Sequence, residues 1–267
     1  MNLDGKHIIV TGAGAGIGLG IARACRAAGA EVTGFDWKTD GAGRLAEIGA
    51  RFMQVDVTDL DGFEAAIAAA HAREGRLDGM VNNAGVTIKV PFLDMTRAQM
   101  ETLWTVNQRS VLVGCQAAGR IMTGAGGGAI VNLSSVHARA TNPGHEAYAA
   151  TKAAIAAMTR AMAWSLGPQG VRVNAICPAL VRTEIVDAAM QDPNQAAQFR
   201  RYNPEGTVTT VDEIGALAVF LLSDAGAALP EFDTAEIASA HQISALFCLF
   251  LLFSLSTSTR TSLACGH

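Results

Sequence analysis

The sequence predicts a single-domain α/β fold: a doubly wound parallel sheet of six to seven strands with helices on both faces. Three observations support this class. A length of 267 residues suits one domain, because α/β folds routinely hold about 200 to 250 residues in one unit. Short β-branched runs alternate with longer alanine-rich runs, which is typical of parallel strands joined by helical crossovers. The short runs are nearly all apolar, as in strands buried on both faces.

The alternation begins close to the N-terminus and continues through most of the chain. In chain order, the β-branched or apolar runs predict strands at His7–Thr11, Glu31–Asp36, Arg51–Val55, Gly79–Asn82, Ala129–Leu133 and Val171–Ile176. The alanine-rich runs that follow them predict helices at Gly16–Gly29, Ala42–Gly49, Leu60–Glu74, Thr96–Met122, Tyr148–Leu166 and Val211–Leu222. No internal repeat and no Pro- or Ser-rich linker divides this body, so we expect one domain.

The composition excludes several classes of protein. Half of the residues are apolar and 16% are charged, which rules out a disordered chain. No apolar run reaches the roughly 18 residues of a membrane-spanning helix, although the mean hydropathy of +0.26 is high. A net charge of -4 argues against a nucleic-acid partner.

Cysteine spacing and the N-terminus bear on location. The five cysteines form no CxxC pair and no zinc-binding spacing, so we expect free thiols and no metal site. The first residues lack the basic-then-apolar layout of a signal peptide. We therefore expect a cytoplasmic protein.

A glycine-rich turn follows the first predicted strand. The run Thr11–Gly18 leads directly into an alanine-rich helix. Glycines permit a tight turn and let backbone N–H groups approach a pyrophosphate at the helix N-terminus, where the dipole favours negative charge. The strict GxGxxG spacing is absent, and a turn without a ligand is the alternative. The candidate coenzyme-binding residues here are Gly12, Gly14, Gly16, Ile17 and Gly18.

An acidic residue, Asp36, ends the second predicted strand. In dinucleotide-binding folds an acidic side chain about 20 residues beyond the glycine turn bonds the adenosine ribose hydroxyls. A carboxylate there repels a 2′-phosphate, and the glycine turn has no Arg or Lys to offset it, so we expect NAD rather than NADP. Lys38 is weak evidence for NADP instead. Alternatively, it is an ordinary solvated lysine in a loop.

Tyr148 and Lys152 are the candidate acid/base pair. At i and i+4 on a helix that starts near Tyr148, they share one face about 6 Å apart along the axis. A phenol is a poor acid or base at neutral pH, because its unperturbed pKa is about 10, and an adjacent ammonium favours the phenolate. For the pair alone, an ordinary Tyr/Lys pair on a solvated helix face is the alternative.

Ser135 is the candidate partner of the substrate oxygen. It lies just past the predicted strand Ala129–Leu133, where open α/β sheets place their ligand crevice. Its hydroxyl can stabilise charge that develops on an oxygen. Ser134, one residue earlier, competes for this role.

Together these motifs resemble the short-chain dehydrogenase/reductase family, in its compact single-domain branch. The resemblance covers residues 5 to about 225 and is carried by Thr11-Gly12-x-x-x-Gly16-x-Gly18, Asn82-Asn-Ala-Gly85, Asn107, Ser135 and Tyr148-x-x-x-Lys152. It selects Ser135 over Ser134, because the family serine lies thirteen residues before the tyrosine. It implies a Rossmann-like sheet and an NAD-dependent enzyme that acts on CH–OH groups.

The resemblance also implies roles for single residues. Tyr148 exchanges the hydroxyl proton, Ser135 steadies the oxygen, and Lys152 favours the phenolate while it holds the nicotinamide ribose. Asn107 holds a water that relays protons to Lys152. Without the resemblance, the alternative is that Asn107 is a solvated or helix-capping residue. Ala179 stands where the family usually has glycine. The further coenzyme contacts implied are Asp56, Val57, Asn83, Ala84, Gly85, Pro178, Val181 and Thr183.

Polar and basic side chains near the predicted reacting centre favour a small sugar, polyol or hydroxy acid as substrate. The expected substrate contacts are Ser135, His137, His145 and Tyr148. Additional candidates are Thr87, Lys89, Arg139, Arg182 and Glu184. For each of these histidines and arginines considered alone, the alternative is a solvated loop residue without a functional role. Segment Val186–Pro204 matches the position of the family's mobile substrate lid.

The chain divides into an NAD-binding catalytic domain, residues 1–228, and an atypical tail, residues 229–267. The tail lacks the family's Thr-Gly and Asp-Gly-Gly and carries the apolar run Ala245–Phe253 instead. Three interpretations are open: a substitute edge strand, a foreign or shifted-frame terminus with little order, and a membrane-contacting segment too short to span. In related enzymes this region helps to form subunit contacts, so the expected homo-oligomer, a dimer or tetramer, depends on it.

The leading prediction is an NAD-dependent dehydrogenase or reductase of a small secondary alcohol or carbonyl compound, with no nucleic-acid partner and no membrane span. The alternative is a non-catalytic NAD-binding or regulatory protein impaired by the altered C-terminus. An epimerase or dehydratase is disfavoured, because relatives with that chemistry carry an added substrate domain.

Overall fold

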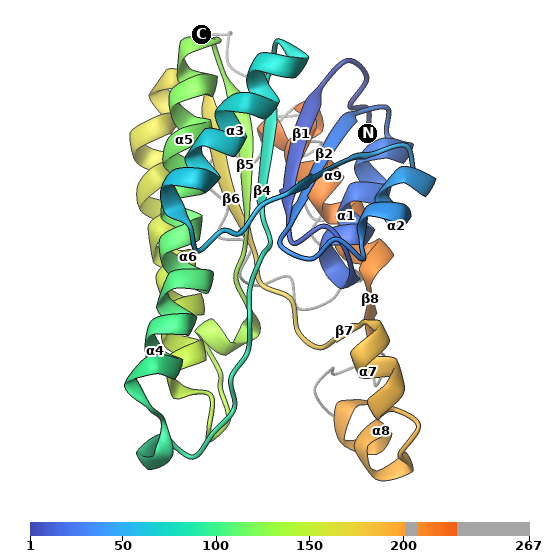
Figure 1. Cartoon of the computed structure of the whole chain (residues 1–267), viewed down its shortest axis with the longest axis vertical. Coiled ribbons are helices and arrows are strands. Elements are labelled where there is room, and N and C mark those ends of the chain that lie inside the picture. Colours follow the sequence, from blue (N-terminus) through green and yellow to red (C-terminus); the bar gives the residue numbers. More distant parts are fainter. Residues whose placement is uncertain (201–207, 229–267) are drawn as a thin grey trace, which may run out of the picture.

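A six-stranded parallel sheet forms the centre of the protein, in a computed structural model that describes residues 1–200 and 208–228 (Figure 1). The strands are β1 (His7–Thr11), β2 (Glu31–Asp36), β3 (Arg51–Gln54), β4 (Gly79–Asn82), β5 (Gly128–Leu133) and β6 (Val171–Ile176). Their order in the sheet is β3-β2-β1-β4-β5-β6, and every pairing is parallel. The order reverses between β1 and β4, so the predicted doubly wound α/β fold is confirmed.

Helices cover both faces of this sheet, because alternate side chains of each strand point to opposite sides. Ile8 and Val10 pack in one apolar cluster, while Ile9 between them packs in the other. On the first face lie α1 (Gly16–Ala27), α2 (Ala42–Glu47) and α9 (Val211–Leu222). On the second lie α3 (Leu60–Glu74), α5 (Ser110–Gly124) and α6 (Glu146–Leu166), with α4 (Arg97–Trp104) leading into α5.

The helix expected over Thr96–Met122 is continuous but not uniform. Between α4 and α5, residues Thr105–Arg109 form a π-helical segment with Asn107 at its centre. A π-bulge inserts one residue into the helix, and such bulges are frequent at functional sites. The expected helical stretch is present, and the π-helical segment within it is a feature that the sequence did not predict.

The segment expected to form the substrate lid is partly helical. Strand β7 (Val181–Arg182) pairs with β8 (Thr209–Thr210), and α7 (Glu184–Ala189) and α8 (Pro193–Arg200) lie between them. In Figure 1 these two helices project beyond the carboxyl ends of the sheet strands. The end of the expected lid falls at residues 201–204, outside the described ranges. Short 3-10 turns occur at Phe92–Asp94, Val136–Ala138, Gly167–Gln169 and Asp224–Ala228.

The atypical tail, residues 229–267, also lies outside the described residues. Within the described ranges, no helix combines the length and the apolar character needed to cross a membrane. Cys25, Cys115 and Cys177 are buried thiols there.

His7 is a buried polar side chain in the central strand β1. Its Nδ1 lies 2.8 Å from the Arg76 carbonyl oxygen, which can only accept, so Nδ1 carries the proton. Its Nε2 lies 2.9 Å from the Thr33 hydroxyl. Burial lowers the pKa of His7 below its ordinary value of 6.5, so the neutral ring is favoured.

Candidate active site

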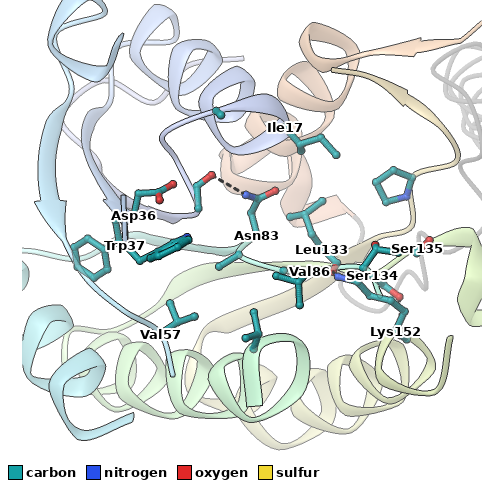
Figure 2. A pocket seen from close by; sticks show the side chains of 18 of the residues that line it. Ile17, Asp36, Trp37, Val57, Asn83, Val86, Leu133, Ser134, Ser135 and Lys152 are labelled. Carbon is teal, nitrogen blue, oxygen red and sulfur yellow. Dashed lines mark hydrogen bonds between the residues drawn. The ribbon is translucent and has the colours of Figure 1, made fainter. Parts of the chain in front are cut away.

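A cavity of about 580 Å³ opens where the carboxyl ends of the strands meet, at the switch point between β1 and β4. Open α/β sheets bind their ligands at this position. Figure 2 shows Asp36 and Trp37 at one end of the cavity, Asn83 in its middle, and Ser134, Ser135 and Lys152 together at the other end. Predicted site residues on its wall are Gly12, Ile17, Asp36, Asp56, Val57, Asn83, Ala84, Gly85, Ser135, Tyr148, Lys152, Pro178 and Thr183.

The glycine turn leaves the N-terminus of α1 open to an anion. Gly12 and Gly16 have φ of +62° and +54°, conformations that favour glycine. The N-cap residue, Ala15, offers no side-chain cap, and the first turn has no acidic residue. The first backbone N–H groups of a helix have no intrahelical partner and favour negative charge. A coenzyme diphosphate fits this position.

Close packing explains why Gly18 has no side chain. A Cβ at Gly18 would overlap the Gly12 carbonyl oxygen and lie 2.5 Å from Asn83 Nδ2. The same amide donates to the Thr11 and Gly12 carbonyl oxygens at 2.9 and 3.2 Å. Asn83 therefore ties the end of β4 to the glycine turn. Gly14, Gly16 and Gly18 shape the turn without lining the cavity.

Asp36 holds a fixed orientation at one end of the cavity. Its Oδ2 accepts from the Gly14 N–H at 2.9 Å, and its Oδ1 accepts from the Lys38 N–H at 3.0 Å. Each oxygen keeps a further lone pair for a ligand hydroxyl. The indole of Trp37, 63% exposed, lines the cavity beside it, with Lys38 Nζ at 5.1 Å from the ring centroid. The sequence interpretation missed Trp37, and its signal was an aromatic residue directly after the strand-end carboxylate.

Tyr148 and Lys152 lie on the first two turns of α6, as expected. Lys152 is buried; its Nζ donates to the Leu133 carbonyl oxygen at 2.8 Å and lies 5.8 Å from the centroid of the Tyr148 ring. Burial lowers the pKa of Lys152 from 10.5 to about 8, because the ammonium loses its hydration. At neutral pH the lysine stays mostly charged, with its charge directed at the phenol ring.

The two serines at the end of β5 make different contacts. Ser134 donates its hydroxyl to the Lys152 carbonyl oxygen at 2.7 Å, and so fastens α6 to the sheet. Ser135 Oγ accepts from the His137 N–H at 3.2 Å, which leaves its hydroxyl hydrogen for a substrate oxygen. The geometry therefore favours Ser135 as the residue that binds the substrate.

Asn107 is fully buried behind the cavity wall. Its side-chain oxygen accepts from the Val86 N–H at 2.8 Å, and its amide donates to the Val86 carbonyl at 2.9 Å and to the Thr151 hydroxyl at 3.2 Å. A Cβ on Gly85 would lie 3.3 Å from Asn107 Oδ1 and 3.4 Å from Lys152 Nζ. The small residue at position 85 thus leaves space between Asn107 and Lys152. Asn107 is not a solvated helix residue.

The two histidines expected to bind substrate surround the Tyr148 ring rather than the cavity. Ring centroids of His137 and His145 lie 5.5 and 6.2 Å from that of Tyr148 and 4.8 Å from each other. His137 Nδ1 lies 2.8 Å from the Thr141 hydroxyl. Burial, and then the neighbouring His145, lower the pKa of His137. Both rings therefore pack around the Tyr148 phenol.

The loop after β6 supplies the last part of the wall. Pro178, Ala179 and Thr183 line the cavity, whereas Val181 is buried beside it. Thr183 is the N-cap residue of α7, yet its side chain makes no capping hydrogen bond. Thr210 does cap its own helix, α9. The Thr183 hydroxyl is therefore available to a ligand.

The additional substrate candidates are spread around the site. Thr87 lines the cavity, whereas the charged candidates are not among its lining residues. Arg182 of β7 pairs with Asp187 of α7 at 2.5 Å. Among the residues that the structure describes, no cluster of three or more His, Cys, Asp or Glu side chains could hold a metal ion.

Known proteins share both the sequence and the fold. A family model described as enoyl-(acyl carrier protein) reductase matches residues 12–229. D-threitol dehydrogenase from Mycolicibacterium smegmatis is 38% identical over 237 residues, which cover 86% of this chain and 91% of that protein. Carbonyl reductase 2 from Sus scrofa, whose name specifies NADPH, is 35% identical over 230 residues, with coverages of 85% and 93%.

A solved structure of a short-chain type dehydrogenase/reductase from Mycobacterium ulcerans has a TM-score of 0.81 to this chain. It is 31% identical, and the match covers 86% of this chain and 87% of that one.

Proposed function

The chain belongs to the short-chain dehydrogenase/reductase family, and from that premise we propose that it transfers hydride between NAD and a small polyol or sugar. One observation carries the proposal. A single cavity joins a fixed carboxylate, Asp36, at one end to Ser135, Tyr148 and Lys152 at the other. A dinucleotide that bonds Asp36 through its adenosine ribose would extend along this cavity to the tyrosine.

The choice of NAD rests on the charge at Asp36. Its two oxygens already orient on backbone N–H groups, so a ribose diol finds acceptors without rearrangement. A 2′-phosphate at the same place would meet a like charge. The NADPH in the name of the porcine relative belongs to that protein, and coenzyme preference here is part of the proposal.

The described side chains support a specific proton path. When bound, the nicotinamide ring accepts or supplies the hydride. Ser135 donates to the substrate oxygen, and Tyr148 takes the hydroxyl proton from an alcohol or returns it to a carbonyl. Lys152, 5.8 Å from the ring centroid, favours the phenolate electrostatically. Asn107 is proposed to hold a water in the space that Gly85 leaves open toward Lys152.

A small polyol fits the surroundings of the tyrosine. The cavity that Tyr148 lines also has hydroxyl groups, Ser135 and Thr87, and the apolar Val86 and Val106 on its walls. His137 and His145 pack around the phenol with ring centroids 5.5 and 6.2 Å from that of Tyr148. D-threitol dehydrogenase is named for a four-carbon polyol, so four- and five-carbon polyols and ketoses are the first substrates to assay.

A homo-oligomer and a cytoplasmic location complete the proposal. Trp104, Leu112 and Trp164 are 40%, 43% and 69% exposed on α4, α5 and α6. Small exposed residues, Ala157 and Ala161, precede Trp164 on α6 and allow a second helix to approach closely. Light scattering coupled to size exclusion would measure whether a dimer or a tetramer forms.

Steady-state turnover with a panel of polyols, ketoses, hydroxy acids and steroids, each with NAD and NADP, tests the function. We expect NAD-linked oxidation of a small polyol, loss of at least about a hundredfold in kcat in Tyr148→Phe, and NADH binding retained in that variant. Turnover of Tyr148→Phe close to wild type would refute the assigned acid/base. NADH binding with no turnover on any alcohol would favour a non-catalytic NAD-binding protein.

A further inference from the structure

An ion pair outside the proposed catalytic centre, between Arg44 and Glu184, links the region of the glycine turn to the first residue of α7. We propose that Arg44 and Glu184 are positioning residues that hold Thr183 against the coenzyme, and so slow coenzyme release. The inference rests on the proposed function, because it assumes that a dinucleotide occupies the cavity.

One guanidinium group makes both contacts. Arg44 extends from α2, and its Nη1 lies 3.3 Å from the Gly14 carbonyl oxygen and 3.5 Å from Glu184 Oε1. Gly14 belongs to the turn at the N-terminus of α1, and Glu184 is the first residue of α7. Arg44 thus bridges two segments that are remote in sequence and that lie close together beside the cavity.

Thr183, which the ion pair would position, lies beside the same turn. A Cβ on Gly16 would lie 3.4 Å from Thr183 Cγ2, in van der Waals contact. Thr183 lines the cavity, and its hydroxyl makes no capping bond. Because Glu184 follows Thr183 directly, any shift of Glu184 moves Thr183 on the cavity wall.

Apolar packing does little to hold the start of α7, whose other ion pair, Arg182–Asp187, joins it only to the adjacent strand β7. None of the residues of α7 is buried, and Ile185 is 84% exposed. The preceding strand, β7, forms only a two-residue ladder with β8. An exposed ion pair is worth about 0.2–1 kcal/mol, and here it acts on a segment that apolar packing does not fix.

Arg44 makes one contact more than Glu184 does. Its Nη1 lies near the Gly14 carbonyl oxygen as well as Glu184, while Asp36 Oδ2 accepts from the N–H of the same glycine. Replacement of Arg44 removes both of its contacts, whereas replacement of Glu184 removes the ion pair alone. We therefore expect loss of Arg44 to have the larger effect of the two.

Stopped-flow measurement of the NADH dissociation rate tests this assignment in Arg44→Gln, Glu184→Gln and the double variant. Each single change should raise the rate by about two- to fivefold. The double variant should match Arg44→Gln, because the second change removes a partner already lost. High salt should reduce the difference between wild type and the single variants.

A matched control is Arg23→Gln, which breaks an exposed pair with Asp212 of similar length, 3.4 Å, away from the cavity. It should leave the rate unchanged. Two results would overturn the positioning role and leave the proposed function standing, provided that the wild type binds NADH and turns over. In the first, the two single changes multiply in their effect on the dissociation rate of the double variant. In the second, neither single change alters the rate. Failure of wild type to bind NADH would overturn both.

Discussion

Replacement of Asp36 by Asn tests coenzyme selection most directly, because it removes a charge and keeps the shape. The carboxylate accepts from two backbone N–H groups at 2.9 and 3.0 Å, and the amide oxygen of Asn can keep one of these bonds. We expect the variant to fold and to lose selectivity for NAD.

The magnitude follows from two contributions. Hydrogen bonds to charged groups contribute about 1.5–3 kcal/mol, against about 0.5–1.5 for neutral pairs, so NAD binding weakens by about 1 kcal/mol. Unit charges about 4 Å apart repel by about 4 kcal/mol at an effective dielectric constant of about 20. Asp36 is partly exposed, and solvent and salt reduce the relief for NADP to about 1–2 kcal/mol. Together these lower the NAD-to-NADP selectivity by about 30-fold or more.

The assay is kcat/KM for each coenzyme at a saturating concentration of one alcohol, with the melting temperature measured beside it. Asp40→Asn is the control, since it removes the same charge from an exposed position on the same loop. Selectivity in Asp36→Asn within about threefold of wild type would refute the assignment of Asp36 as the coenzyme-selecting residue.

Three further predictions concern stability. Gly18→Ala should abolish NADH binding and lower the melting temperature, because the added Cβ overlaps the Gly12 carbonyl oxygen. The control Gly43→Ala has nothing within 4 Å of its Cβ and should stabilise the protein by about 0.5–1 kcal/mol. Equal melting temperatures of the two variants would contradict this prediction. The pKa of Lys152 is lowered from 10.5 to about 8, so the unfolded chain binds more protons between these values. Lys152→Met should therefore stop turnover yet raise the free energy of unfolding, measured in urea at neutral pH, by up to about 3 kcal/mol. The difference in stability between the variant and the wild type should shrink as pH rises from about 8 to 10.5. A variant less stable than the wild type at neutral pH would refute this prediction. The pKa of buried His7 lies below 6.5, so the unfolded chain gains the proton first and stability falls as pH drops below about 6.5. His7→Gln should flatten that slope in urea unfolding, and an unchanged slope would count against it.

The local patterns were sufficient for the fold and for most of the cavity wall. Strands such as Glu31–Asp36 and Gly79–Asn82 have the predicted bounds, because apolar β-branched runs punctuated by glycine define strand ends locally. The glycine turn and Asp36 follow from the same logic, since each lies at the carboxyl end of a parallel strand. All such ends meet at one edge of the sheet.

Contacts between distant segments could not be predicted in this way. The sequence indicates an ordinary helix around Asn107, and only the π-bulge and the amide contacts to Val86 explain its burial. It likewise suggests that His137 and His145 face the substrate, whereas they pack around the Tyr148 ring. These placements depend on how helices pack, which no local periodicity encodes.

The sequence by itself determined the succession of strands and helices along the chain and the residue types at the strand ends, because periodicity and turn chemistry are local properties. The order of the strands in the sheet, and with it the switch point between β1 and β4, came from the tertiary structure. Tertiary structure alone decided which of two adjacent serines is left with a free hydroxyl hydrogen, since Ser134 is occupied by the Lys152 carbonyl of α6. It alone brought Arg44 to the glycine turn, which the sequence shows without any basic residue. Hydrogen bonds and ion pairs act through space, and only the folded chain places their partners within reach.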